Sequence, residues 1–504
     1  MNYIYQSFLN IENIKLFLVL MTFIVLSLMM FFRKIPALLA LPIMAFLLPI
    51  IAGVNIYDTI EYVMGMGAIK LSKAYTIAIF GSMLSVLLQK TGVAENFIKK
   101  GAELAGDKPF SIAIVMIILI TILFSTLGGL GAIIMVATVV LPIMSSVGIG
   151  PVTICGIFLF GLSIGGLLNA GNWSVYIETL KLEVGEIKSF ALIMFVLTFS
   201  IGIVYITFQL YKDGREINLK KIGVSITFLI LMSSLGVLFW NYKIDEETKK
   251  NLWILFGDIL GIAKQAIGYL IAMLFAISIM YSIGILKSYK NIYWTAYFTP
   301  LVPLFLILIF EMDFIAAFIC GLLYGYLSTM RKGSLNLLVR SIFEGGGLVM
   351  PAVALMLGIG MLLNSIMGPG AEVLNKNGNY VQGWPVLNLL KPLLIQITPK
   401  NGLEFVLVFS LAAPLALYRG PLNVWGMGYG IAAILLASGM APGAIMALLL
   451  AVGQIQGISD PTNTQNVWLA NEMKTDAQKI LFNTLPYTWL IAIIGLIIAA
   501  MKYY

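Results

Sequence analysis

The chain has 504 residues, of which 60% are hydrophobic and 11% are charged, with a formal net charge of +8. Soluble globular domains carry about 25% charged residues, so this composition excludes an ordinary soluble enzyme or binding module. Histidine is absent, which excludes histidine general bases and histidine-ligated zinc or haem. The basic residues form no stripe interleaved with aromatic residues, so nucleic acid is not expected as a partner.

Apolar segments long enough to cross about 30 Å of hydrocarbon recur along the whole chain. Membrane-spanning helices are predicted over residues 15–32, 189–211 and 480–501, among others. Arg33 and Lys34 follow the first of these without a small-residue cleavage site, so it is interpreted as a span rather than a signal peptide. Residues 1–504 are therefore expected to form a single transmembrane domain in the inner (cytoplasmic) membrane, with the lipid bilayer as a partner.

In chain order, four stretches are too polar or too rich in glycine and proline for a lipid-facing helix. The first tip, residues 125–131, joins two short apolar segments over 110–147, and the first break, residues 169–174, follows the apolar run 151–168. The second tip, residues 418–423, lies within the apolar pair 401–438, and the second break covers residues 459–466. Irregular backbone at membrane depth is tolerated only where protein buries it or a wet cavity faces it.

The order of elements in the first half recurs in the second, which predicts an internal repeat. Gly358 follows Gly81 by 277 positions, and Glu372 follows Glu95 by the same number. Further along, Gly420 follows Gly129 and Asn463 follows Asn172 by 291 positions, with Pro151 and Pro442 at the same offset. The extra residues fall in the loop before Asn401.

Loop charges indicate that the two halves have opposite orientations. If the pairs 110–147 and 401–438 are re-entrant hairpins and the N-terminus is outside, more lysine and arginine residues face the cytoplasm than the exterior, as the positive-inside rule requires. The predicted fold class is thus all-α polytopic, with two inverted-topology repeats, each containing a re-entrant helical hairpin and a broken transmembrane helix. The repeats are assigned to 15–211 and 291–504, with connecting spans over 212–290 (224–241 and about 266–286).

The tips and breaks are the predicted site, because half-helix N-termini attract anions and unwound carbonyls and hydroxyls bind cations. Arg419 at membrane depth is interpreted either as a clamp on a substrate carboxylate or as a structural partner of Asp460 or a carbonyl. Asp460 is either a cation or proton site or a helix N-cap. The amides of Asn172 and Asn463 either contact the solute or sodium or cap their helices. Gly345-Gly346-Gly347 lacks the context of a phosphate loop, so it is interpreted as a hinge or close-packing site.

The predicted site residues fall into two groups. The substrate-binding group is Ser125, Thr126, Gly128, Gly129, Asn172, Arg419, Gly420, Asn423, Asn463 and Thr464. The coupling-cation group is Asn169, Asp460 and Thr462. No catalytic residue and no cofactor is expected, and the only metal considered is Na⁺ as the coupling ion.

These stretches resemble the ion transporter superfamily of bacterial membrane carriers, which includes divalent-anion/sodium symporters and citrate, gluconate and C4-dicarboxylate permeases. The resemblance covers about 35–211 and 314–501 and depends on Gly420-Pro421-Leu422-Asn423 and Asp460-Pro461-Thr462-Asn463-Thr464. It implies a scaffold part, a moving part with two hairpins, homodimers and an elevator-like movement. Sodium-coupled dicarboxylate members have Ser-Asn-Thr at each tip, whereas this chain has Ser125-Thr126 and Arg419-Gly420-Pro421. The resemblance therefore specifies neither a dicarboxylate substrate nor sodium as the coupling ion.

The leading hypothesis is a secondary active transporter of a small organic anion, a carboxylate, coupled to Na⁺ or H⁺. The chain contains no Walker motif, so ATP would have to act through another subunit. The alternative is a Na⁺/H⁺ antiporter in which Asp460 exchanges the cations and Arg419 is structural. An intramembrane enzyme is not expected, because the sequence shows neither a histidine-based site nor paired intramembrane acids.

Overall fold

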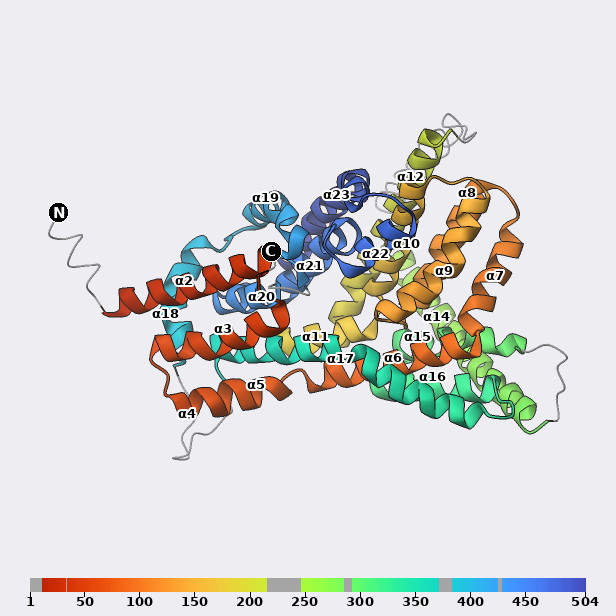
Figure 1. Cartoon of the computed structure of the whole chain (residues 1–504), viewed down its shortest axis with the longest axis horizontal. Helices are drawn as coiled ribbons and strands as arrows, with labels where there is room; N and C mark the ends of the chain where they lie inside the picture. Colours follow the sequence, from red (N-terminus) through yellow and green to blue (C-terminus); the bar gives the residue numbers. More distant parts are fainter. Residues whose placement is uncertain (1–10, 33, 215–245, 285–291, 371–382, 425–427) are drawn as a thin grey trace.

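The protein is all-helical in the computed structural model, which describes residues 11–32, 34–214, 246–284, 292–370, 383–424 and 428–504 (Figure 1). The helices of the first half are α2 (Ile11–Phe31), α3 (Ala37–Ala52), α4 (Ile56–Asp58), the π-helix η1 (Thr59–Gly65), α5 (Met66–Ile69), α6 (Ser72–Thr91), α7 (Val93–Ala105), α8 (Pro109–Phe124), α9 (Leu130–Ser146), α10 (Pro151–Leu167), α11 (Ala170–Leu180) and α12 (Val184–Lys212).

The remaining helices follow from residue 246 onward. They are α14 (Glu246–Ser282), the 3-10 helix η2 (Trp294–Phe298), α15 (Leu301–Leu308), α16 (Phe314–Ser328), α17 (Ser334–Met367), α18 (Pro385–Ile397), α19 (Gly402–Ala412), the 3-10 helix η3 (Ala413–Arg419), α20 (Tyr429–Ala437), α21 (Pro442–Gln454), the π-helix η5 (Ile455–Ser459), α22 (Thr464–Glu472) and α23 (Ala477–Tyr503).

Eight helical segments of the described chain are long and apolar enough to cross a membrane, and the bent pair α10–α11 would make a ninth. The predicted spans 15–32, 189–211 and 480–501 are confirmed as helices α2, α12 and α23. The protein is therefore a multi-pass membrane protein. The predicted connecting span 266–286 corresponds to the C-terminal part of α14, whereas the predicted span 224–241 and Glu372 lie outside the described residues.

The two helices expected on either side of the first tip are present. Helices α8 and α9 have 16 and 17 residues, shorter than the roughly 20 residues that a spanning helix needs. The break after residue 168 is present as well: α10 ends at Leu167, α11 begins at Ala170, and the two are bent by 49°. The first half thus contains the predicted sequence of short pair, interrupted helix and long span.

In the second half, the short pair is less regular than its counterpart. Helix α19 continues into η3, and together they form an 18-residue apolar segment that alone passes the length test for a span. The segment ends in a kink, because Leu417 and Tyr418 have non-helical backbone angles. The second break lies between η5, which ends at Ser459, and α22, which begins at Thr464. The long α23 closes this half as α12 closes the first.

Helices α6 and α17, which contain the matched Gly81 and Gly358, belong to two long segments that pack closely against each other (Figure 1). A Cβ atom added at Gly345 would lie 2.6 Å from the Cα atom of Met83, and one added at Gly67 would lie 2.7 Å from the Cα atom of Met361. Since the residue number falls along one segment as it rises along the other, the two segments run antiparallel where they touch. Glycine allows this close backbone approach, as in other membrane helix pairs.

The interrupted helices also meet in antiparallel fashion. The Sγ atom of Cys155 in α10 lies 3.7 Å from the carbonyl oxygen of Leu469 in α22. Further along α10, Ser163 donates a hydrogen bond of 2.7 Å to the Oε1 atom of Gln454. Ser163 and Gln454 are 291 positions apart, which is the offset that the sequence predicts between the two halves. Residues at matched positions of the two interrupted helices therefore touch.

The glycine triplet 345–347 gives a matched test of this packing. A Gly345→Ala substitution should destabilise the protein by about 1–3 kcal/mol, because the added methyl group overlaps the backbone of α6. Gly347→Ala in the same helix should be neutral within about 0.5 kcal/mol, since no atom lies within 4 Å of its added Cβ.

The measurement is the thermal midpoint of each variant, purified in the same detergent. Equal midpoints for the two alanine variants would contradict the close antiparallel packing of α6 and α17.

Candidate functional site

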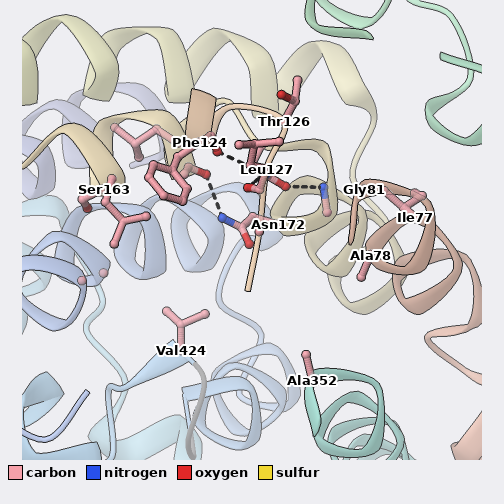
Figure 2. A pocket seen from close by; sticks show the side chains of 18 of the residues that line it. Ile77, Ala78, Gly81, Phe124, Thr126, Leu127, Ser163, Asn172, Ala352 and Val424 are labelled. Atoms are coloured by element: carbon pink, nitrogen blue, oxygen red, sulfur yellow. Dashed lines mark hydrogen bonds between the residues drawn. The ribbon is translucent and has the colours of Figure 1, made fainter. Parts of the chain in front are cut away.

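A cavity of about 310 Å³ lies where the first tip, the two interrupted helices and the long pair α6–α17 meet. Phe124, Leu127 and Asn172 lie on one side of it, and Val424 and Ala352 face them from the other (Figure 2). The volume is at the lower end of the range typical of small-molecule sites. The structure thus contains a partly open cavity lined by residues of both halves of the chain.

The cavity is polar in places but uncharged. None of the described residues that line it is acidic or basic. Its walls are apolar where Phe124, Leu127, Phe318 and Val424 contribute. The polar side chains among the lining residues are Ser82, Thr126, Ser163, Asn169, Asn172, Tyr176, Tyr429, Gln454, Gln456 and Gln465. A ligand here would be recognised by neutral hydrogen-bonding groups rather than by an ion pair.

Helix ends border the cavity. The N-terminal residues of α11, Gly171 and Asn172, line it, as do Gln465 near the start of α22 and Gly128 just before α9. The C-terminal residues Gly166 and Leu167 of α10, together with Gln456 and Gly457 of η5, line it as well. Helix N-termini present a partial positive charge and C-termini a partial negative charge. The site therefore offers both kinds of dipole without a formal charge.

Asn169 holds the first tip against the first break. Its Nδ2 atom donates hydrogen bonds to the carbonyl oxygens of Phe124 and Leu127, at 3.2 and 3.3 Å. Its Oδ1 atom accepts from the backbone N–H of Gly171 at 2.9 Å, which caps α11. One amide side chain thus satisfies carbonyl groups at the end of α8 and a donor at the start of α11.

Asp460 holds the second tip in the same way but with the opposite hydrogen-bonding role. Its fully buried carboxylate accepts from the backbone N–H groups of Tyr418 and Arg419, at 3.1 and 3.3 Å. It also accepts from the Nδ2 atom of Asn423 at 3.2 Å, and from both the backbone N–H and the hydroxyl of Thr462 at 2.9 and 2.7 Å. These five donors come from the tip and the break, so the carboxylate ties the two together.

The two anchors lie at the offset predicted for the repeat, since Asp460 follows Asn169 by 291 positions. The matched asparagines also behave alike: Asn172 donates to the carbonyl oxygen of Gly166 at 2.8 Å, and Asn463 donates to that of Gln456 at 2.5 Å. Each side chain satisfies a carbonyl of the preceding half-helix. The breaks are therefore held by local hydrogen bonds at equivalent places.

The second tip has an unusual backbone. Tyr418 and Arg419 have φ angles of +55° and +59°, in the left-handed region that side chains with a Cβ atom adopt at a cost. Gly420 follows, and a Cβ atom there would lie 2.0 Å from the carbonyl oxygen of Leu415. Only glycine fits this turn. The bonds from Tyr418 and Arg419 to Asp460 hold the conformation in place.

The structure brings four of the residues predicted from sequence to the cavity: Thr126, Gly128, Asn169 and Asn172. Asn423 and Thr462 bond to Asp460 instead, away from the cavity lining. The hydroxyls of Ser125 and Thr126 donate to carbonyl groups of their own helix, which is a structural use. Gly129, Gly420, Asn463, Thr464 and Arg419 are not among the residues that line the cavity.

Arg419 lies at the second tip and is exposed, with its backbone rather than its side chain bonded to Asp460. Its predicted role as a carboxylate clamp therefore stays a prediction, as does the cation role of Asp460. The sequence analysis missed the cavity residues Ser82, Ser163, Gln454, Gln456 and Gln465. A signal existed for two of them, because Gln454 and Gln456 are the amides that interrupt the apolar run before the second break.

No protein-family model matches the chain, and no curated protein matches it. Solved structures similar to it include two membrane transporters. A transporter from Alcanivorax borkumensis, YdaH, described as having an unusual topology, matches with 12% identity over 86% of each chain and a TM-score of 0.45. MtrF from Neisseria gonorrhoeae, described as illuminating a class of antimetabolite efflux pumps, matches with 15% identity over 88% of this chain and 81% of its own, with a TM-score of 0.42.

The anchoring role of Asp460 is testable by proteolysis. Asp460→Asn replaces one acceptor oxygen by an N–H₂ group, which faces the donors of the tip and leaves some of them unbonded. Because each lost bond to a buried carboxylate costs about 1.5–3 kcal/mol, the second tip should open and trypsin should cut after the exposed Arg419 at least about tenfold faster than in the wild type.

The fragment ending at Arg419 is quantified by mass spectrometry relative to cleavage after Lys332. Asp476→Asn is the matched control, since Asp476 caps α23 through a single exposed bond to Gln478. Equal cleavage after Arg419 in the wild type and Asp460→Asn would disprove the anchor.

Proposed function

We propose that the protein is a secondary active transporter that binds a small organic anion in the cavity between its two interrupted helices. The observation that supports this proposal most strongly is the cavity itself, which is bordered by helix ends and by neutral amides and hydroxyls. Substrate sites of many transporters lie between discontinuous helices whose N-termini face an anion and whose C-terminal carbonyls face a coupling cation. The same combination is present here without a charged side chain in the cavity lining.

An anion fits the donors at this site. The N-termini of α11 and α22 border the cavity, and helix N-termini attract carboxylates and phosphates through N–H groups and the helix dipole. The first N–H groups of α11 already bond to Asn169, so α11 contributes its dipole, whereas α22 has no side-chain cap. The carbonyl groups at the ends of α10 and η5 are suitable for Na⁺, which favours oxygen ligands, or for a hydrated proton carrier. Coupling to one of these cations would balance the charge of a carboxylate during transport.

The contacts between the halves support two inverted repeats. The segments around α6 and α17 cross antiparallel, and the interrupted helices touch at Ser163 and Gln454, which are matched positions. Two elements related by a two-fold axis in the membrane plane run antiparallel, and residues on the axis meet their own counterparts. We therefore propose an elevator-like movement of the tips and breaks against the rest of the chain, within a homodimer in the inner membrane as the resemblance implies.

The Na⁺/H⁺ antiporter is less favoured as a function. That mechanism requires a carboxylate that exchanges its ligands during each cycle. Asp460 accepts five hydrogen bonds that hold the second tip, and it does not line the cavity. Breaking this anchor in each cycle would release a tip whose backbone is already strained.

Reconstituted protein in liposomes separates the two functions. The proposal predicts accumulation of a radiolabelled small carboxylate when an inward Na⁺ or H⁺ gradient is imposed, and no accumulation when the gradient is collapsed with an ionophore. In the absence of any carboxylate, Na⁺ addition should leave an imposed pH gradient intact. Dissipation of that gradient by Na⁺ alone, together with no carboxylate uptake, would contradict the proposal and support the antiporter.

Two variants locate the substrate site in the same assay. Asn172→Ala removes an amide that lines the cavity and should lower the uptake rate at least about tenfold. Arg419→Ala removes an exposed side chain outside the cavity and should retain more than about a third of the rate. If Arg419→Ala lowers the uptake rate more than Asn172→Ala does, the substrate binds at Arg419, as in the carboxylate clamp considered from the sequence.

A further inference from the structure

Asn172 presents an unused hydrogen-bond acceptor to the cavity. Its Nδ2 atom donates to the carbonyl oxygen of Gly166, and only an N–H₂ group can face a carbonyl, so the orientation of the amide is fixed. The remaining Oδ1 atom bonds to no described residue, and the side chain points toward the cavity in Figure 2. A carboxylate oxygen is also an acceptor, so it cannot form a hydrogen bond with this atom.

Gln456 presents the opposite group from the other half of the chain. Its Oε1 atom accepts a hydrogen bond of 3.3 Å from the backbone N–H of Val424, which fixes the orientation of this amide as well. The Nε2 atom is therefore the free end, and no described residue accepts its hydrogens. Gln456 also lines the cavity while being 6% exposed. Both free groups face the cavity, so a ligand that bonds to both replaces the water that would otherwise occupy them and is favoured.

The charge of the cavity limits the ligand further. The described lining has no basic side chain, and each bordering helix N-terminus contributes only about half an elementary charge. One carboxylate and its coupling cation can be accommodated there, whereas a second carboxylate would be desolvated without a partner, at a cost of several kcal/mol. Dicarboxylates and tricarboxylates are therefore poor ligands for this conformation.

Building on the proposed function, we infer that the transported anion carries a single carboxylate together with a carboxamide. A carboxamide has an N–H donor for the Oδ1 atom of Asn172 and a carbonyl acceptor for the Nε2 atom of Gln456. The apolar walls formed by Phe124, Leu127 and Val424 suit a short hydrocarbon portion between the two groups.

A series of three compounds with one carbon skeleton tests this inference: adipate, its monoamide adipamate and its diamide adipamide. They carry two, one and no negative charges and share the same apolar chain. Binding to the purified full-length protein in detergent is measured by isothermal calorimetry with Na⁺ present at pH 7. Adipamate should bind at least about tenfold more tightly than adipate, and adipamide should bind more tightly than adipate as well.

The variant Gln456→Glu checks the donor. It keeps an oxygen for the N–H of Val424 but replaces the free donor by an acceptor, so the affinity for the uncharged adipamide should fall about tenfold, a change that repulsion between charges cannot explain. Asn471→Asp is the matched control, because it is the same kind of substitution at an exposed position of α22 outside the cavity lining.

The outcomes separate this inference from the proposed function. Three results would contradict the inferred carboxamide group of the ligand. They are tighter binding of adipate than of adipamate, unchanged binding of adipamide to the Gln456→Glu variant, and binding of none of the three compounds. Gradient-driven uptake of carboxylates by the same preparation would leave the transporter standing in each of those cases. Conversely, the predicted order of affinities without gradient-driven uptake would support the inferred ligand class and contradict the proposed transport function.

Discussion

The whole arrangement depends on one constraint: a helix that is interrupted inside a membrane protein must have its freed backbone groups bonded within the protein. Each open N–H or C=O group in hydrocarbon costs several kcal/mol. Here one side chain in each break bonds to several of these groups. Asn169 donates to the carbonyl groups of the first tip, and Asp460 accepts from the N–H groups of the second tip. Asn169 also caps α11, and Asp460 also accepts from Thr462 in the second break, so each break is joined to its own tip.

The difference between an amide and a carboxylate at these matched positions follows from what each tip offers. The first tip follows the regular helix α8, whose last carbonyl groups need donors, and the amide of Asn169 supplies them. The second tip begins at the end of the 3-10 helix η3 with two left-handed residues, and the N–H groups of both face the Asp460 carboxylate. Successive N–H groups of this kind form an anion-binding concavity, and the carboxylate of Asp460 occupies it. Asn169 and Asp460 can therefore each hold a tip against a break although one is an amide and the other a carboxylate.

The sequence predicted the architecture better than the chemistry. Long apolar runs and glycine-rich interruptions located α8, α9, α10 and α11 to within a few residues, because both signals come from backbone requirements that are local. The predicted site centred on Arg419 and Asp460, since charged residues stand out in an apolar sequence. The structure places the cavity among neutral amides, and Gln456 or Ser82 cannot be singled out without knowing which helix faces meet. Of the two interpretations of the glycine triplet, a hinge or a close-packing site, close packing holds for Gly345, whereas Gly346 and Gly347 have open space.

The central claim is that the two interrupted helices meet antiparallel at matched positions beside the cavity, and a cysteine pair tests it most directly. A Cβ atom at Gly457 would lie 3.6 Å from that of Ser163, within the range of a disulfide. With Cys155 and Cys320 replaced by alanine, Ser163→Cys with Gly457→Cys should oxidise readily and lose its labelling by a polyethylene-glycol maleimide. The control pair Ser163→Cys with Gly453→Cys should stay labelled, because a Cβ atom at Gly453 meets only Val424 within 4 Å. Equal labelling of both pairs after oxidation would contradict the account.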